Sequence, residues 1–178
     1  MEYDECGRMN KVEYPDGTQE QVLYNEHNYP VKTINRDGTE SLYTYDDKGN
    51  LIQETDPLGY STAFTYDAMG NCTAQQDRNG RKLQYTFNAA NQLTQVQDAA
   101  GAATQYTYDS MGRVKTVIDP LANQTSYSYD NAGRITSITD TLGNTRSYTY
   151  DALGNLLRKD VRGDTSTTQA KSRHFAIQ

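Results

Sequence analysis

The stretch YTYDSMGR, residues 106–113, decides the fold because the chain contains close copies of it at regular intervals. These copies are YTYDDKGN at 43–50, FTYDAMGN at 64–71, YSYDNAGR at 127–134 and YTYDALGN at 148–155. The second aromatic residue of each copy lies 21 residues after the previous one, and the same spacing extends back to Tyr24 and Tyr3. A fixed period of this length indicates a repeat architecture, in which each unit packs against its neighbours.

Residues 101–122 show how one unit is expected to fold. The segment TQYTYD alternates polar and aromatic residues, which predicts a strand with Tyr106 and Tyr108 on one face. Asp109 and Gly112 then supply a turn, since a carboxylate can accept hydrogen bonds from nearby amides and glycine can adopt a positive φ. The unit is therefore predicted to be β-rich, with a glycine turn after its first strand.

The segment VKTVI predicts the return strand, and DPLA predicts a second turn that closes the unit. Val114 and Val117 are three residues apart, although a regular strand places every second residue on one face. A β-bulge or a strong local twist would reconcile this spacing with a strand. Helix is a poor alternative because Thr, Tyr and Gly are frequent in every unit.

Five copies keep the second tyrosine, the aspartate and the glycine together, and we treat these residues as defining the repeat. They are Tyr45, Asp46 and Gly49; Tyr66, Asp67 and Gly70; Tyr108, Asp109 and Gly112; Tyr129, Asp130 and Gly133; and Tyr150, Asp151 and Gly154. Asn28 and Asn91 replace the glycine in two other copies, and asparagine is the next-best residue for a left-handed turn. We expect eight 21-residue repeats over residues 1–160 and a polar, flexible tail over 161–178.

Composition narrows the function. The chain has 178 residues, 15 of them tyrosine, and a net charge of −6, which argues against binding nucleic acid. No apolar run is long enough to span a membrane, and the first residues are too polar for a signal peptide. Cys6 and Cys72 stand in distant repeats, so no disulfide between them is expected. The first repeat begins in register at Met1, which suggests a piece of a longer array.

The run Y-x-Y-D-x-x-G-[RN]-[LVI], followed by D-P-x-G-x, resembles the YD repeat of the Rhs family over about residues 1–160. The resemblance implies β-hairpins joined edge to edge into one long antiparallel sheet, which curves and spirals as a segment of an Rhs-type shell. In Rhs and toxin-complex proteins such a shell encloses a C-terminal toxin domain, and in teneurins it serves as a cell-surface scaffold. The implied partners are flanking Rhs repeats and a toxin or effector domain of a larger secreted or cell-surface protein. DPLGY at 56–60 and DPLAN at 119–123 lack the context of the family's self-cleavage segment, so no protease site is carried over.

Three sharper interpretations compete with a purely structural one. The repeated aspartates could form a calcium ladder, although calcium needs six to eight oxygens at one point and turn capping is simpler. The tyrosine rows could bind surface glycans as aromatic platforms, although cross-strand aromatic packing is simpler. His27 and His174 lack the nucleophile and orienting group that catalysis requires. We therefore expect no enzyme, no cofactor and no metal, and a structural role with carbohydrate binding as the alternative.

Overall fold

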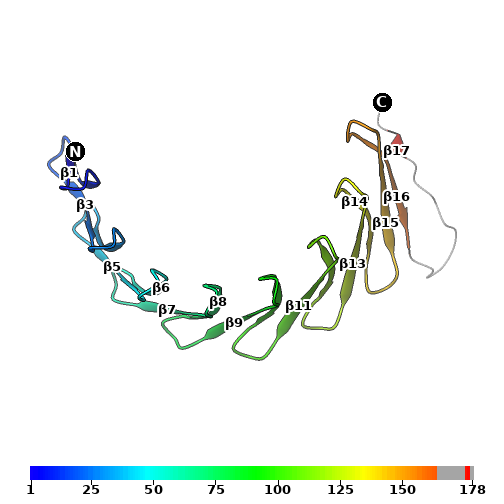
Figure 1. Ribbon diagram of the computed structural model, residues 1–178, viewed down its shortest axis with the longest axis horizontal. Coiled ribbons are helices and arrows are strands. Elements are labelled where there is room, and N and C mark those ends of the chain that lie inside the picture. Colours follow the sequence, from blue (N-terminus) through cyan, green and yellow to red (C-terminus); the bar gives the residue numbers. More distant parts are fainter. Residues whose placement is uncertain (164–174, 177–178) are drawn as a thin grey trace. The chain divides into compact units, whose positions relative to one another are not determined.

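The computed structural model describes residues 1–163 and 175–176, and every regular element among them is a β-strand (Figure 1). The chain divides into two units, Met1–Tyr85 and Thr86–Gln178. Within each unit consecutive strands pair antiparallel, so each unit is a meander of hairpins. The all-β, antiparallel hairpin fold predicted from the repeat is confirmed.

The first unit contains eight complete strands and the start of a ninth. They are β1 (Glu2–Tyr3), β2 (Met9–Glu13), β3 (Gln19–Tyr24), β4 (Pro30–Ile34), β5 (Glu40–Tyr45), β6 (Leu51–Thr55), β7 (Ser61–Tyr66), β8 (Cys72–Gln76) and β9 (Lys82–Phe87), whose last two residues belong to the second unit. The short second strand of each repeat is five residues long, as in β4 and β6, and the first is six, as in β3 and β5. The 21-residue period is thus two strands and two turns.

The second unit continues the same pattern. Its strands are β10 (Leu93–Gln97), β11 (Ala103–Tyr108), β12 (Val114–Ile118), β13 (Gln124–Tyr129), β14 (Ile135–Thr139), β15 (Thr145–Tyr150), β16 (Leu156–Arg162) and β17 (Phe175–Ala176). The turn after β10, β12 and β14 lies at one edge of this unit, and the turn after β11, β13 and β15 lies at the opposite edge (Figure 1). We call these the second-turn row and the first-turn row.

A β-bulge explains the three-residue spacing on the return strand. Tyr106 pairs with Val117 and Tyr108 pairs with Val114, with a register shift between these pairs that leaves Lys115 as the extra residue. Both valines therefore lie opposite tyrosines although they are three positions apart. The same shift recurs between β13 and β14 and between β5 and β6, so the predicted bulge is a regular part of the repeat.

The turn residues adopt the left-handed conformation that the sequence predicts. The φ angles of Gly70, Gly112, Gly133 and Gly154 are 86, 80, 83 and 91°. The substituted positions follow suit, with φ of 68° at Asn28, 58° at Asn91 and 63° at Ala122. The replacement of glycine in these repeats therefore leaves the turn geometry intact, at some cost in strain for Ala122.

The sheet has almost no dry core. Ala74, at 4% exposure, is the one buried hydrophobic residue among the residues that the structure describes. The tyrosines Tyr106, Tyr108, Tyr127 and Tyr129 are half-buried. A single layer of this kind cannot depend on a buried hydrophobic interior, so contacts between adjacent repeats must contribute much of its stability.

The end of the array differs from the expected boundary at residue 160. Strand β16 runs to Arg162, which pairs with Thr145, because backbone pairing continues after the side-chain pattern of the repeat has stopped. Phe175 in β17 pairs with Lys159 of β16. The flexibility expected for the tail concerns residues 164–174 and 177–178, which lie outside the described residues.

Candidate functional site

The first turn of each repeat is organised by its aspartate. In the repeat beginning at β11, the Asp109 Oδ1 atom accepts hydrogen bonds from the backbone amides of Met111 and Arg113, at 2.9 and 3.0 Å. Asp46, Asp67, Asp130 and Asp151 make the same pair of bonds to the residues two and four positions later. These contacts confirm the predicted turn capping.

The second carboxylate oxygen bonds to the side chain that follows the glycine. Asp109 Oδ2 accepts a hydrogen bond from Arg113 Nε at 2.7 Å, and Asp46 Oδ2 accepts one from Asn50 Nδ2 at 2.9 Å. These side-chain bonds, followed by the backbone bonds, hold the pKa of both carboxyls below the ordinary value. Both oxygens of each aspartate are thus used within its own turn. Over residues 1–163, no group of three or more His, Cys, Asp or Glu side chains is placed to hold a metal.

The arginine that the aspartate orients reaches the next repeat. The Arg113 guanidinium lies over the ring of Tyr129, 4.5 Å from its centroid, and its Nη1 atom donates to the backbone oxygen of Asp130 at 3.0 Å. Arg134 makes the equivalent contacts with Tyr150, at 4.7 Å, and with the Asp151 oxygen, at 3.0 Å. The guanidinium therefore joins two repeats through a cation–π contact and a charge-assisted hydrogen bond.

The second tyrosine of each repeat reaches in the opposite direction. The Tyr129 hydroxyl donates to the backbone oxygen of Val114, the first residue of the preceding return strand, at 2.8 Å. The same bond, always to a residue fifteen positions earlier, recurs at Tyr24 (3.3 Å), Tyr45 (2.9 Å), Tyr66 (2.8 Å), Tyr108 (2.6 Å) and Tyr150 (2.8 Å). We call the tyrosine-to-carbonyl bond together with the arginine stack the repeat junction.

Burial supports the donor role of these hydroxyls. It is the first cause of the raised pKa of Tyr45 and Tyr66, so both phenols stay protonated at higher pH than an exposed tyrosine. The rings themselves differ from the expected aromatic pairing. Tyr106 and Tyr127 have the aliphatic cross-strand partners Val117 and Ile138. The tyrosine rows are thus built on aromatic–aliphatic pairs and on hydroxyl bonds to the backbone.

One first turn replaces its side chains while keeping its backbone. Asn25 Oδ1 accepts hydrogen bonds from the amides of His27 and Tyr29, as aspartate does elsewhere. Tyr29 takes the place of the arginine and stacks on Tyr45, with ring centroids 5.0 Å apart. A Cβ atom at Gly49 would lie 2.2 Å from the Tyr29 hydroxyl, so glycine is required there by close approach as well as by its φ of 84°. A groove of about 370 Å³ lies beside this stack.

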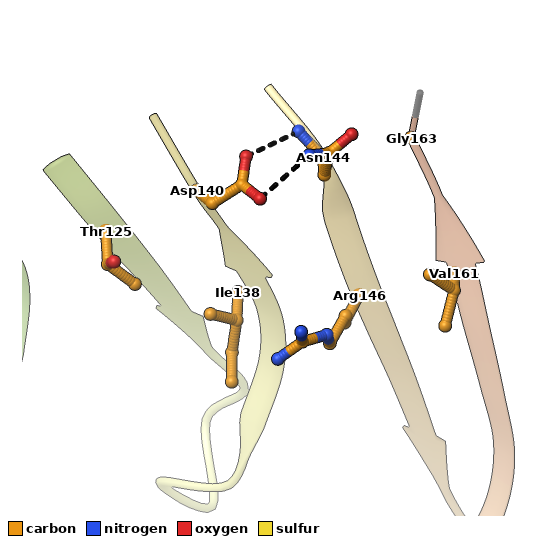
Figure 2. A pocket seen from close by; sticks show the side chains of 7 residues that line it. All are labelled: Thr125, Ile138, Asp140, Asn144, Arg146, Val161 and Gly163. Atoms are coloured by element: carbon orange, nitrogen blue, oxygen red, sulfur yellow. Dashed lines mark hydrogen bonds between the residues drawn. The ribbon is translucent and has the colours of Figure 1, made fainter. Parts of the chain in front are cut away.

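The second-turn row offers a shallow groove of about 480 Å³, which Figure 2 shows from close by. Its floor is formed by Ile138 and Val161, with Arg146 between them on β15. Asp140 at its rim accepts hydrogen bonds from both the backbone and the side-chain nitrogen of Asn144, each at 2.9 Å. These bonds place the carboxylate in the turn, so the groove presents no acid–base pair for catalysis.

The structure therefore brings the repeat-defining residues together in two ways. The aspartate and glycine of one repeat share a turn, and the tyrosine connects that repeat to the one before it. The residue after the glycine was not singled out as functional from the sequence, yet it completes the repeat junction when it is arginine. The signal was present in the sequence, because Arg8, Arg113 and Arg134 follow the glycine and a tyrosine stands sixteen residues after each.

Comparisons with known proteins agree with this architecture. A family model described as RHS Repeat matches residues 45–82, 87–124, 112–145 and 129–165, together more than half of the chain. A comparison with curated protein sequences found no match. In the part of the chain that the structure describes, no helix has the length and hydropathy needed to cross a membrane.

Solved structures of toxin-complex proteins are similar to the chain. The crystal structure of TcdB2-TccC3-Cdc42 matches 89% of this chain with 18% identity and a TM-score of 0.60. TcdB2-TccC3 without its hypervariable C-terminal region matches 95% with 19% identity and a TM-score of 0.60. The Photorhabdus luminescens Tc holotoxin pore matches 87% with 18% identity and a TM-score of 0.50. This chain spans 9%, 9% and 10% of the length of those three chains, and at these identities the likeness shows a shared fold.

Proposed function

Because the chain belongs to the RHS repeat family, we propose that it is a non-catalytic structural segment of a shell that encapsulates or presents a C-terminal toxin or effector domain. The shell would be part of a larger secreted or cell-surface protein. Its direct partners would be the RHS repeats on either side and the enclosed domain.

The observation that carries this proposal is how the repeat-defining residues are used. Asp109 caps a turn and orients Arg113, and Arg113 and Tyr129 join one repeat to the next. These side chains hold adjacent hairpins together and leave no nucleophile, base or metal-binding set among them. A chain built in this way can extend a wall by adding repeats, which is a structural function.

The sheet face opposite the tyrosines supports the same role. In β10–β15 it carries hydroxyl, amide and a few small apolar side chains without charge. Its members are Gln95, Gln97, Ala103, Gln105, Thr107, Thr116, Ile118, Gln124, Ser126, Ser128, Ser137, Thr139, Thr145, Ser147 and Thr149. Such a face can adjoin another polypeptide without forming strong ion pairs to it, as a container wall requires.

The alternative function is a carbohydrate- or surface-binding module that uses the tyrosine rows. A sugar platform needs an accessible aromatic face. The rings of Tyr24, Tyr129 and Tyr150 are each covered by a guanidinium, and their hydroxyls are bonded to the backbone. These contacts favour the structural role, and glycan-array binding by the purified chain would favour the alternative.

Protease protection in the intact parent protein tests the proposed function. The domain that follows the repeats should resist a protease that digests the same domain rapidly when it is expressed alone. Replacing Tyr108, Tyr129 and Tyr150 with alanine should open the repeat junctions and expose the domain. Thr107→Ala, on the exposed opposite face, is the matched control and should keep the protection. Equal cleavage of the domain in the intact parent and alone would contradict encapsulation.

A further inference from the structure

The second-turn row of the second unit presents exposed leucines on consecutive turns. Leu121 and Leu142 are 83% and 84% exposed, among the most exposed large apolar side chains in the described residues. They follow β12 and β14 and therefore lie side by side along one edge of the unit (Figure 1). Fully exposed leucines on adjacent turns are the kind of feature that marks a protein interaction site.

These tips are held in place before any partner binds. The amide of Leu121 donates to Asp119 Oδ1 at 2.8 Å, and the amide of Leu142 donates to Asp140 Oδ1 at 3.0 Å. The hydroxyl of Thr141 accepts a hydrogen bond from the backbone amide of Gln124, which ties the two turns together. Little conformational freedom would be lost when such preorganised tips are buried.

The row is also free of charge at its tips. The two central residues of its turns are Ala99 and Ala100, Pro120 and Leu121, and Thr141 and Leu142. The carboxylates of Asp98, Asp119 and Asp140 stand at the base of each turn, where they accept bonds from their own turn amides. By contrast, the corresponding turns of the first unit carry charged tips at Asp16, Arg36, Asp37 and Arg78.

Neutral tips matter most when a surface meets a copy of itself. In a two-fold symmetric contact the same patch is present on both sides, so charged tips would face like charges. The leucines are 21 residues apart in sequence, which is two strand spacings, or about 9.6 Å, along the edge. A second copy offers the same spacing, so its leucines can fit between those of the first.

We propose that the second-turn row of the second unit is a homotypic interface, in which two copies of this chain pack antiparallel through Leu121 and Leu142. This inference does not depend on the proposed function. Three turns give an interface at the small end of the size range for specific complexes, so the association should be weak and dependent on concentration.

Sedimentation velocity of the full 178-residue chain over a rising concentration series tests this. The unmodified chain should form dimers at the upper concentrations, and the double variant Leu121→Lys, Leu142→Lys should weaken the association at least tenfold. Leu58→Lys is the matched control, because Leu58 occupies the same kind of Asp-Pro-Leu turn in the first unit and is 77% exposed. It should associate like the unmodified chain.

The milder pair Leu121→Ser, Leu142→Ser removes the apolar surface without adding charge and should also weaken the dimer, with circular dichroism and melting unchanged. A chain that stays monomeric throughout overturns the proposal. An association that survives both double variants, or that Leu58→Lys removes equally, overturns it too. Binding of the monomer to phosphatidylcholine vesicles without self-association would assign the leucines to a lipid surface and would likewise refute it.

Discussion

Removing a single hydroxyl, in Tyr129→Phe, isolates the tyrosine half of the repeat junction. The phenol donates to the Val114 backbone oxygen at 2.8 Å in a half-buried position, and phenylalanine keeps the ring under the Arg113 guanidinium. A net intramolecular hydrogen bond contributes about 0.5–1.5 kcal/mol. Water can reach part of this site, so we expect a loss of about 1 kcal/mol in the free energy of unfolding.

For a chain of this size that loss corresponds to a fall of roughly 2–4 °C in melting temperature. Urea denaturation followed by circular dichroism, with the slope of the transition checked for change, measures the free energy directly. The matched control is Tyr106→Phe on the neighbouring strand pair, whose ring packs opposite Val117. No hydroxyl bond joins Tyr106 to another described residue, so the control should change stability by less than about 0.5 kcal/mol.

A double-variant cycle with Arg113→Ala then tests whether the two halves act together. Arg113 and Tyr129 are in direct contact, so their effects should be non-additive by at least about 0.5 kcal/mol. Equal stability of Tyr129→Phe and Tyr106→Phe would refute the claim that the hydroxyl bond joins repeats. Additive effects of the two changes would refute the claim that the arginine and tyrosine form one junction.

Three further outcomes are expected. Gly112→Val should cost more than about 1 kcal/mol, because φ is 80° there and β-branched residues are strained in that region, whereas Gly112→Asn should cost less, as Asn28 and Asn91 occupy equivalent turns; urea melts giving equal losses would contradict this. Acid should destabilise the array: the folded pKa of Asp109, Asp130 and Asp151 is lowered, so the stability they contribute is present above their unfolded value of about 3.9 and is lost as the pH falls through the lower folded values, and a flat stability between pH 5 and 2 would argue against it. The purified chain should show no hydrolase, nuclease or transferase activity, and robust nuclease activity retained after deletion of residues 161–178 would overturn that expectation.

Much of the fold follows from the period and from local chemistry. Asp109 and Gly112 predict a capped left-handed turn because both effects act within five residues. The spacing of Val114 and Val117 predicts the bulge because a regular strand cannot place both on one face. These features depend on neighbours in sequence, so one repeat is enough to deduce them.

The repeat junction depends on neighbours in space and could not be assigned from one repeat. The acceptor of Tyr129 is a backbone oxygen fifteen residues earlier, and a carbonyl has no sequence signature. The useful signal is the residue type: the slot holds tyrosine in every repeat except at Phe87, although phenylalanine would bury the same ring. The extension of β16 to Arg162 was likewise hidden, because backbone pairing does not require the side-chain pattern of the repeat.

The central claim is that this chain forms part of the wall of a shell in a larger protein. A structure of the intact parent protein, determined by electron cryo-microscopy, tests it most directly. We predict that the strands over residues 2–162 belong to one continuous curved sheet that surrounds the polypeptide following the repeats, with the second tyrosine of each repeat bonded to the carbonyl fifteen residues before it. An open array with nothing enclosed, or a glycan bound across the tyrosine rows, would contradict the account.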